Sequence, residues 1–408
     1  MAEESAAAGG DATGYVTVEI YDQIYHLSGQ DTEHIRGLAA RVDAKMRAVA
    51  ALTFLGTRAL AEGVRVSAIA LVVSVALGTS ERLAVFIVIA LTILYTFEGG
   101  MKAVIWTDVA QFLLYLTGSL VTLGLLLHRI PNGWNEVAQV ANLHGNKLQV
   151  LDFSWDLATK YTFWSGLIGG TFLTLATHGT DQTIVQRLLA ARSQTDSGRA
   201  LVASGFIVTF QFAVFLLVGI LLFVFAQHTP LLAAGERADR ILPMFLVREM
   251  PMGLAGLLLA SILAVAMSNA SGSLNSLAAS SVLDLQALRG RQTDPAQFLK
   301  ISRRMTLLWG AVLIFFALVK WGELLEAGLT LLSLPFGSLL GLFLLGTFDK
   351  RVTAKAALAG MTTALAAVLL LYRFTTVAFT WYFFIGSAIT FAVGASLSRI
   401  FPARPSTP

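Results

Sequence analysis

The chain has 408 residues, of which 56% are hydrophobic and only 13% are charged. Soluble domains carry about 25% charged residues, so this composition excludes a soluble globular enzyme as the default and indicates a polytopic membrane protein. The 26 Phe and only 9 Pro favour helices over a porin-type barrel, and the absence of cysteine excludes disulfides, thiolate metal sites and palmitoyl anchors.

The charge differs between the start of the chain and the rest. Residues 1–50 hold eight acidic and four basic residues, a net charge of −4, whereas the other 358 residues have a net charge of +8. This basic excess is modest and gathers in loops, which disfavours nucleic-acid binding. The first residues have neither the basic nor the apolar stretch of a signal peptide, so we expect this end in the cytosol.

Residues 15–50 have the pattern of a ββα unit, after a tail of residues 1–14 that we expect to be disordered. Val16, Val18 and Ile20 alternate with polar residues, and a second short apolar run completes a predicted β-hairpin. Apolar residues then recur at helical spacing as far as Val49. So short a unit cannot bury a stable core alone, and we expect it to need a partner.

Downstream, residues 52–400 form the predicted transmembrane domain, followed by a cytosolic tail of residues 401–408. Ten apolar stretches are long enough to cross a bilayer of roughly 30 Å; they lie at about 52–78, 83–97, 103–128, 161–179, 199–227, 241–266, 304–320, 325–346, 352–373 and 377–400. The connections near 187–199, 285–304 and 350–355 are rich in bases, whereas those at 129–160 and 229–249 are balanced. The positive-inside rule therefore places both termini in the cytosol.

Of the carboxylates in or beside predicted spans, where buried charge is costly and marks candidate functional sites, we single out Asp108 and Asp181. Asp108 lies a little over one turn into the third span, where it could coordinate a cation, reach back to the interface or cap a helix break. Asp181 follows Thr180 and Gly179 at the cytosolic half of the fourth span. A break at Gly179 could expose backbone groups to a ligand, or these residues could form a polar helix end without a ligand.

The densest polar cluster, Ser268-Asn269-Ala270-Ser271-Gly272-Ser273-Leu274-Asn275-Ser276, belongs to the sixth span. Hydroxyl and amide oxygens suit sodium-like cations, although small side chains also permit close helix packing. Pro335 and Gly337 are expected to interrupt the eighth span. We find no Walker loop, HExxH, GxGxxG or nucleophile elbow, so no catalytic constellation is predicted and the protein is not expected to be an enzyme.

From about Leu52 onward the chain resembles the sodium:solute symporter family. The resemblance rests on the run from Tyr95 to Gln111, the run from Gly179 to Arg187, and the Ser/Asn cluster that ends at Asn275-Ser276 with Asp284 beyond it. It implies an all-α membrane protein of about ten transmembrane helices with the inverted-repeat bundle of the leucine transporter, and Na⁺ as coupling ion.

The resemblance also implies site residues. It assigns the Val265 carbonyl and the side chains of Ser268, Asn269, Ser271 and Asp108 to sodium binding, and Thr180, Asp181 and Gln182 to the substrate. The first span matches the third helix of the family's ten-helix core. We therefore expect the first two core helices to be missing, the inverted-repeat bundle to be incomplete, and the chain to be inactive in transport on its own.

Residues 15–50 resemble the head of ZapA, the cell-division protein that bundles FtsZ, through the run from Val16 to Tyr25 and the helix from Ala39 to Arg47. The leading prediction is sodium-coupled transport of a small organic solute across the bacterial inner membrane. The alternative is a division-associated membrane protein whose residues 15–50 bind FtsZ or self-associate. The abrupt join between the two resemblances is typical of a gene fusion or an assembly error.

Overall fold

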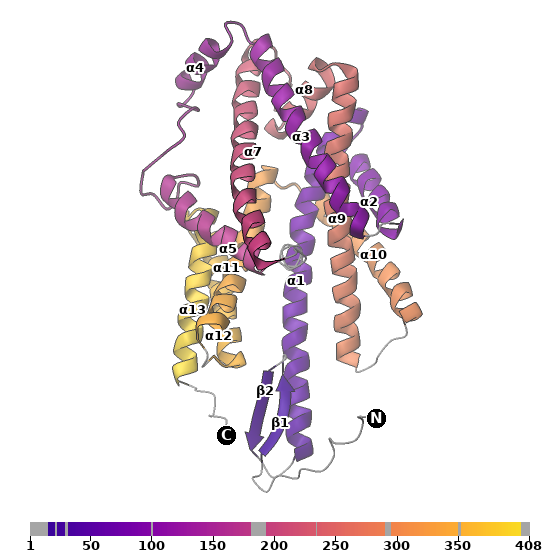
Figure 1. The fold of residues 1–408 in the computed structure, drawn as a ribbon, viewed down its shortest axis with the longest axis vertical. Coiled ribbons are helices and arrows are strands. Elements are labelled where there is room, and N and C mark those ends of the chain that lie inside the picture. The colour runs from indigo at the N-terminus through magenta and orange to yellow at the C-terminus, as the bar shows by residue number, and fades with distance from the viewer. Residues whose placement is uncertain are drawn as a thin grey trace.

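The computed structural model describes residues 15–20, 23–28, 32–98, 101–180, 193–233, 235–289, 295–349 and 352–400. In several helical stretches, among them residues 32–54 and 101–108, it describes the backbone alone. Helices make up most of the described chain, and the longest of them run roughly side by side (Figure 1).

The first described elements are two antiparallel strands, β1 (Tyr15–Ile20) and β2 (Gln23–Ser28). They lie beside the N-terminal part of α1 (Thr32–Leu77) in Figure 1, and β1 contacts this helix. α1 is a single helix of 46 residues, and its part from Leu55 to Leu77 is long and apolar enough to cross a membrane. The predicted boundary between residues 15–50 and 52–400 therefore falls inside one continuous helix.

Further helices follow along the chain. They are α2 (Glu81–Glu98), α3 (Met101–Arg129), α4 (Trp134–Leu143), the π-helical turn η1 (Ser165–Gly169), α5 (Gly170–Thr180), α7 (Gln194–His228), the 3₁₀ turn η2 (Ala238–Arg240), α8 (Ile241–Glu249), α9 (Met252–Arg289), α10 (Pro295–Ala317), α11 (Leu324–Phe348), α12 (Ala354–Phe374), the 3₁₀ turn η3 (Phe379–Trp381) and α13 (Tyr382–Ile400). α4 lies within the connection 129–160, for which no helix was predicted.

In the described part of the chain, seven helices are long and apolar enough to cross a membrane, so the predicted number of ten is not confirmed. The seven are in α1, α3, α7, α9, α11, α12 and η3–α13. The other three predicted spans correspond to α2, α5 and α10. α2 has 18 residues with charged groups at both ends, α5 has 11 described residues, and α10 carries three basic residues.

The predictions for two spans are wrong in different ways. The sixth was expected at 241–266, but the short helix α8 ends before Pro251 and a separate helix, α9, begins at Met252. Proline lacks the N–H that would continue α8, but it is well accommodated before the first turn of α9. The eighth span is not interrupted, because α11 continues through Pro335.

Three groups of helices form the apolar core. α1, α2, α9 and α10 enclose one cluster of buried residues, and α3, α4, α7, α8 and α9 enclose a second. α5 packs with α11, α12 and α13 in a third group, which lies to one side of the others in Figure 1. α9 belongs to the first two groups, so part of its polar segment packs against other helices, whereas Asn269 and Asn275 are exposed.

Aromatic side chains mark one end of the α11–α13 group. In the loop before η1, Trp155 lies 6.0 Å from Trp381 and Tyr161 lies 6.3 Å from Phe379, measured between ring centroids. Phe379 is the first residue of the last candidate span. Because Trp and Tyr concentrate at membrane–water interfaces, this cluster indicates the membrane boundary at the start of α13.

Candidate functional site

The predicted cation ligands on α9 lie inside its membrane-spanning part, Met252–Val282. This helix packs against α1, α2, α3 and α10. We therefore define the α9 polar segment as residues 265–276.

Ser271 connects the α9 polar segment to α2. Its side chain is buried, and its hydroxyl oxygen lies 2.9 Å from the hydroxyl oxygen of Thr96, within hydrogen-bond distance. Thr96 in turn donates to the carbonyl of Thr92, one turn earlier in α2, at 2.6 Å. Ser271 thus lies beside the C-terminal end of α2, and α3 begins only a few residues after α2 ends.

Asn269 bonds to its own helix. Its Nδ2 donates to the Val265 carbonyl at 3.1 Å, so the carbonyl that the resemblance assigns to sodium already accepts one hydrogen bond. As part of α9, this carbonyl also accepts the helical hydrogen bond from the backbone N–H of Asn269, so both of its lone pairs are engaged in this structure. Asn269 is exposed, whereas the neighbouring Ser268 is partly buried. The amide nitrogen of Asn269 thus bonds to Val265, which leaves the amide oxygen as the atom of this side chain that could bind a cation.

A charged network that the sequence analysis missed joins α9 to α1. Ser273 is fully buried, and its hydroxyl donates to Glu62 Oε2 at 2.8 Å. Arg58 Nη2 lies 3.0 Å from the same hydroxyl, and Arg65 Nη1 lies 3.4 Å from Glu62 Oε2. Glu62 is 1% exposed, and in the described part of the chain its other carboxylate oxygen is buried without a hydrogen-bond partner.

The sequence does contain a signal for this network. Arg58, Glu62 and Arg65 lie within the first predicted span at spacings of four and three residues, which place them on one face of a helix. A carboxylate inside a span is a candidate functional residue. The partner Ser273 could not have been identified, because its distance in sequence carries no information about the packing of α1 against α9.

The remaining predicted residues lie apart from the α9 polar segment or outside the described side chains. Asp108 belongs to α3, of which residues 101–108 are described by backbone alone, and Asp181 and Gln182 lie outside the described residues. Thr180 ends α5 and donates to the Ala176 carbonyl at 2.6 Å. α5 packs against α11 and α13, so Thr180 belongs to a different group of helices from Ser268.

Comparison with known proteins identifies the family. The model of the sodium:solute symporter family matches residues 36–364. The chain belongs to this family. The match begins inside the segment 15–50 that resembles ZapA, and the comparisons give no support for a ZapA-like head there or for association with FtsZ. The symporter part of the predicted resemblance is therefore confirmed, and the ZapA part stays a prediction.

The relatives are sodium-coupled transporters. The sodium/sialic acid symporter NanT of Aliivibrio fischeri is 30% identical over 373 residues, covering 89% of this chain and 73% of the relative. The sodium/sialic acid symporter SiaT of Proteus mirabilis is 30% identical over 378 residues, covering 90% of this chain and 75% of the relative. The human sodium/iodide cotransporter is 34% identical over 288 residues, covering 67% of this chain and 43% of the relative.

A solved structure has the same fold. The substrate-bound, outward-open state of a Na⁺-coupled sialic acid symporter matches with a TM-score of 0.74 and 29% identity, covering 89% of this chain and 76% of that one. Family membership and this likeness support Na⁺ as the coupling ion. Together with the seven candidate spans, they identify a multi-pass membrane protein of a transporter fold.

Proposed function

We propose that this symporter-family protein functions in the transport of a small organic solute across the bacterial inner membrane together with Na⁺, with both termini in the cytosol. The expected inactivity of the chain on its own stays a prediction. The observation that carries the proposal is the family match over residues 36–364. The basic connections at 187–199, 285–304 and 350–355 support the orientation. Thr180, Asp181 and Gln182 remain the proposed substrate contacts.

The proposed sodium ligands are Asp108, the Val265 carbonyl and the side chains of Ser268, Asn269 and Ser271. The packing of α3 against α9 supports the inclusion of Asp108. Arg129 at the end of α3 pairs with Glu249, just before α9 begins, so the two helices are antiparallel.

A close approach between α3 and α9 supports placing Asp108 and Ser268 at a similar depth in the membrane. A Cβ atom on Gly118 would lie 1.8 Å from Leu258 Cδ2, so the two helices meet at this point. Asp108 precedes Gly118 by ten residues and Ser268 follows Leu258 by ten, so in an antiparallel pair both lie toward the same end. At about 1.5 Å per residue, both lie about 15 Å from the meeting point along their helices.

Sodium binding can be measured without knowledge of the solute. We expect NaCl to raise the melting temperature of the purified full chain in a saturable manner, relative to equal concentrations of KCl or choline chloride, because the ion binds the folded state. Asp108→Asn and Ser268→Ala should abolish the Na⁺-specific increase, since each removes an anionic or hydroxyl ligand.

The matched control is Ser204→Ala. Ser204 on α7 is half-buried, and its hydroxyl donates to the Leu201 carbonyl of its own helix, away from the α9 polar segment, so this variant should keep the full sodium effect. An equal increase with sodium and potassium, or one that survives in Asp108→Asn, contradicts the proposed ligands.

A further inference from the structure

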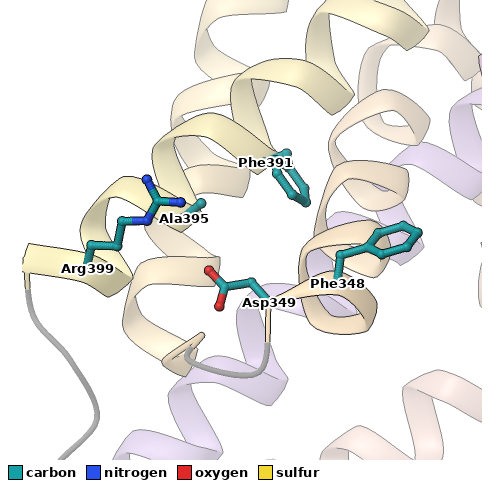
Figure 2. A pocket seen from close by; sticks show the side chains of 5 residues that line it. All are labelled: Phe348, Asp349, Phe391, Ala395 and Arg399. Carbon is teal, nitrogen blue, oxygen red and sulfur yellow. The ribbon is translucent and has the colours of Figure 1, made fainter.

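A small cavity opens between the C-terminal ends of α11 and α13, far from the α9 polar segment. Its volume is about 260 Å³. Five residues line it: Phe348, Asp349, Phe391, Ala395 and Arg399. Figure 2 shows the carboxylate of Asp349 directed toward the side on which Arg399 lies, with Phe391 above it and the ring of Phe348 directed away. We call it the α11/α13 cavity.

The cavity lies at a membrane boundary. Phe348 and Ile400 end two candidate spans, and Arg399 is next to the last residue of α13. The aromatic cluster at Trp381 marks the opposite boundary. Eighteen residues separate Trp381 from Arg399, a helical length of about 27 Å at 1.5 Å per residue, close to the thickness of a bilayer's hydrocarbon core.

The surrounding charge assigns the cavity to the cytosolic leaflet. The connection that leaves Asp349 carries Lys350, Arg351 and Lys355, and basic connections face the cytosol. Phe348 is 73% exposed and Ile400 is 66% exposed, so apolar side chains border the charged groups on the protein surface. Such a border of charged and apolar groups is where a phospholipid headgroup meets its acyl chains.

The charged groups match a zwitterion. A guanidinium presents several N–H donors to a phosphate, and a carboxylate accepts several hydrogen bonds at once, so Asp349 can receive an ammonium group beside other donors. A ring such as that of Phe391 can also attract a cation over its face. The cavity is smaller than the roughly 300–1,000 Å³ of sites that enclose a whole ligand, which suits a headgroup whose tails stay outside.

We propose that the α11/α13 cavity binds the headgroup of a phosphatidylethanolamine-type lipid, with the phosphate on Arg399 and the ammonium on Asp349. Phosphatidylcholine fits less well because its quaternary ammonium has no N–H to donate to the carboxylate. Phosphatidylglycerol has no cation for Asp349 and adds negative charge beside it. The site therefore predicts tighter binding of the ethanolamine lipid than of the glycerol lipid. Basic residues alone would give the opposite order, because they attract anionic lipids.

Native mass spectrometry of the full chain in detergent tests this preference. The protein is titrated with the ethanolamine, choline and glycerol lipids of identical acyl chains, and with water-soluble glycerophosphoethanolamine. We expect the ethanolamine lipid to bind most tightly and the soluble headgroup only weakly. Arg399→Gln and Asp349→Asn should each weaken ethanolamine-lipid binding about fivefold, as expected for the loss of one charge contact near a surface.

Arg373→Gln is the matched control. Arg373 also lies in the last turn of a helix, α12, but at the opposite end of the group, so this variant should bind the lipid like the wild type. Arg399→Lys keeps the charge and should restore most of the binding. Circular dichroism identifies any variant that fails to fold. Equal binding of all three lipids, tighter binding of the glycerol lipid, or an equal loss in Arg373→Gln overturns the proposal.

Discussion

Replacing Glu62 by Gln is expected to lower the free energy of unfolding by about 3 kcal/mol, in the range measured when one partner of a buried charge pair is removed. Glu62 is the anion of a network with two arginines. Arg65 Nη1 lies 3.4 Å from Glu62 Oε2, and the Ser273 hydroxyl lies between Glu62 and Arg58. Gln can still accept the hydrogen bond from Ser273 but leaves positive charge uncompensated between α1 and α9. The value lies at the low end because Arg65 is 46% exposed.

The measurement is denaturant unfolding in detergent, followed by tryptophan fluorescence. Glu326→Gln is the matched control, because Glu326 pairs at 2.5 Å with Lys160 but lies partly in solvent. The hydrogen bond to Glu326 raises the pKa of Lys160, yet exposed pairs of this kind contribute only about 0–1 kcal/mol. Glu62→Asp retains the charge and should be less destabilising than Glu62→Gln. A loss no larger than that of Glu326→Gln would refute the importance of the buried network.

Replacing Gly341 by Ala is expected to destabilise the α11–α13 pair by about 2 kcal/mol or more, because overpacking a close contact typically costs about 1–3 kcal/mol. A Cβ at Gly341 would lie 2.6 Å from the carbonyl oxygen of Ser387 and 2.6 Å from Thr390 Cβ. Backbone atoms cannot rotate away, so the two helices would have to separate. This separation would also stretch the 2.8 Å hydrogen bond from Ser387 to the Gly337 carbonyl.

Gly346→Ala provides the control in the same helix. A Cβ at Gly346 meets no atom within 4 Å, so the substitution should be neutral or stabilising by about 0.5–1 kcal/mol, the usual advantage of Ala in a helix. Thermal unfolding in detergent compares the two variants. Equal melting temperatures for Gly341→Ala and Gly346→Ala would show that the close approach is not required.

The sequence predicted the features that depend on local composition. Apolar stretches located six of the seven helices of spanning length in the described part of the chain, all but α9, and the motifs around Asp108 and Ser268 identified the family that the comparisons confirm. The boundary between α8 and α9 was missed because most of residues 241–266 are apolar, although Arg248, Glu249 and Pro251 together signal a break.

Contacts between distant segments were beyond the reach of the sequence pattern. The bond between Ser273 and Glu62 joins residues 211 positions apart, and nothing in the spacing of either helix identifies the partner. Likewise, the spacing of Gly337 and Gly341, four residues apart in the eighth predicted span, is compatible with packing or with a binding site. The atoms of α13 that a Cβ would meet identify these glycines as a packing surface.

The continuity of α1 has a mechanical consequence. Its 46 residues form a rod about 69 Å long at 1.5 Å per residue, and the strands β1 and β2 lie beside the end that precedes the membrane span. With no break between Thr32 and Leu77, a tilt imposed at the strand end is transmitted directly to Glu62 and hence to α9. A partner that moves the strand pair would therefore also shift α1 at Glu62. Through the Glu62–Ser273 hydrogen bond, it would act on α9, the helix that carries most of the proposed sodium ligands.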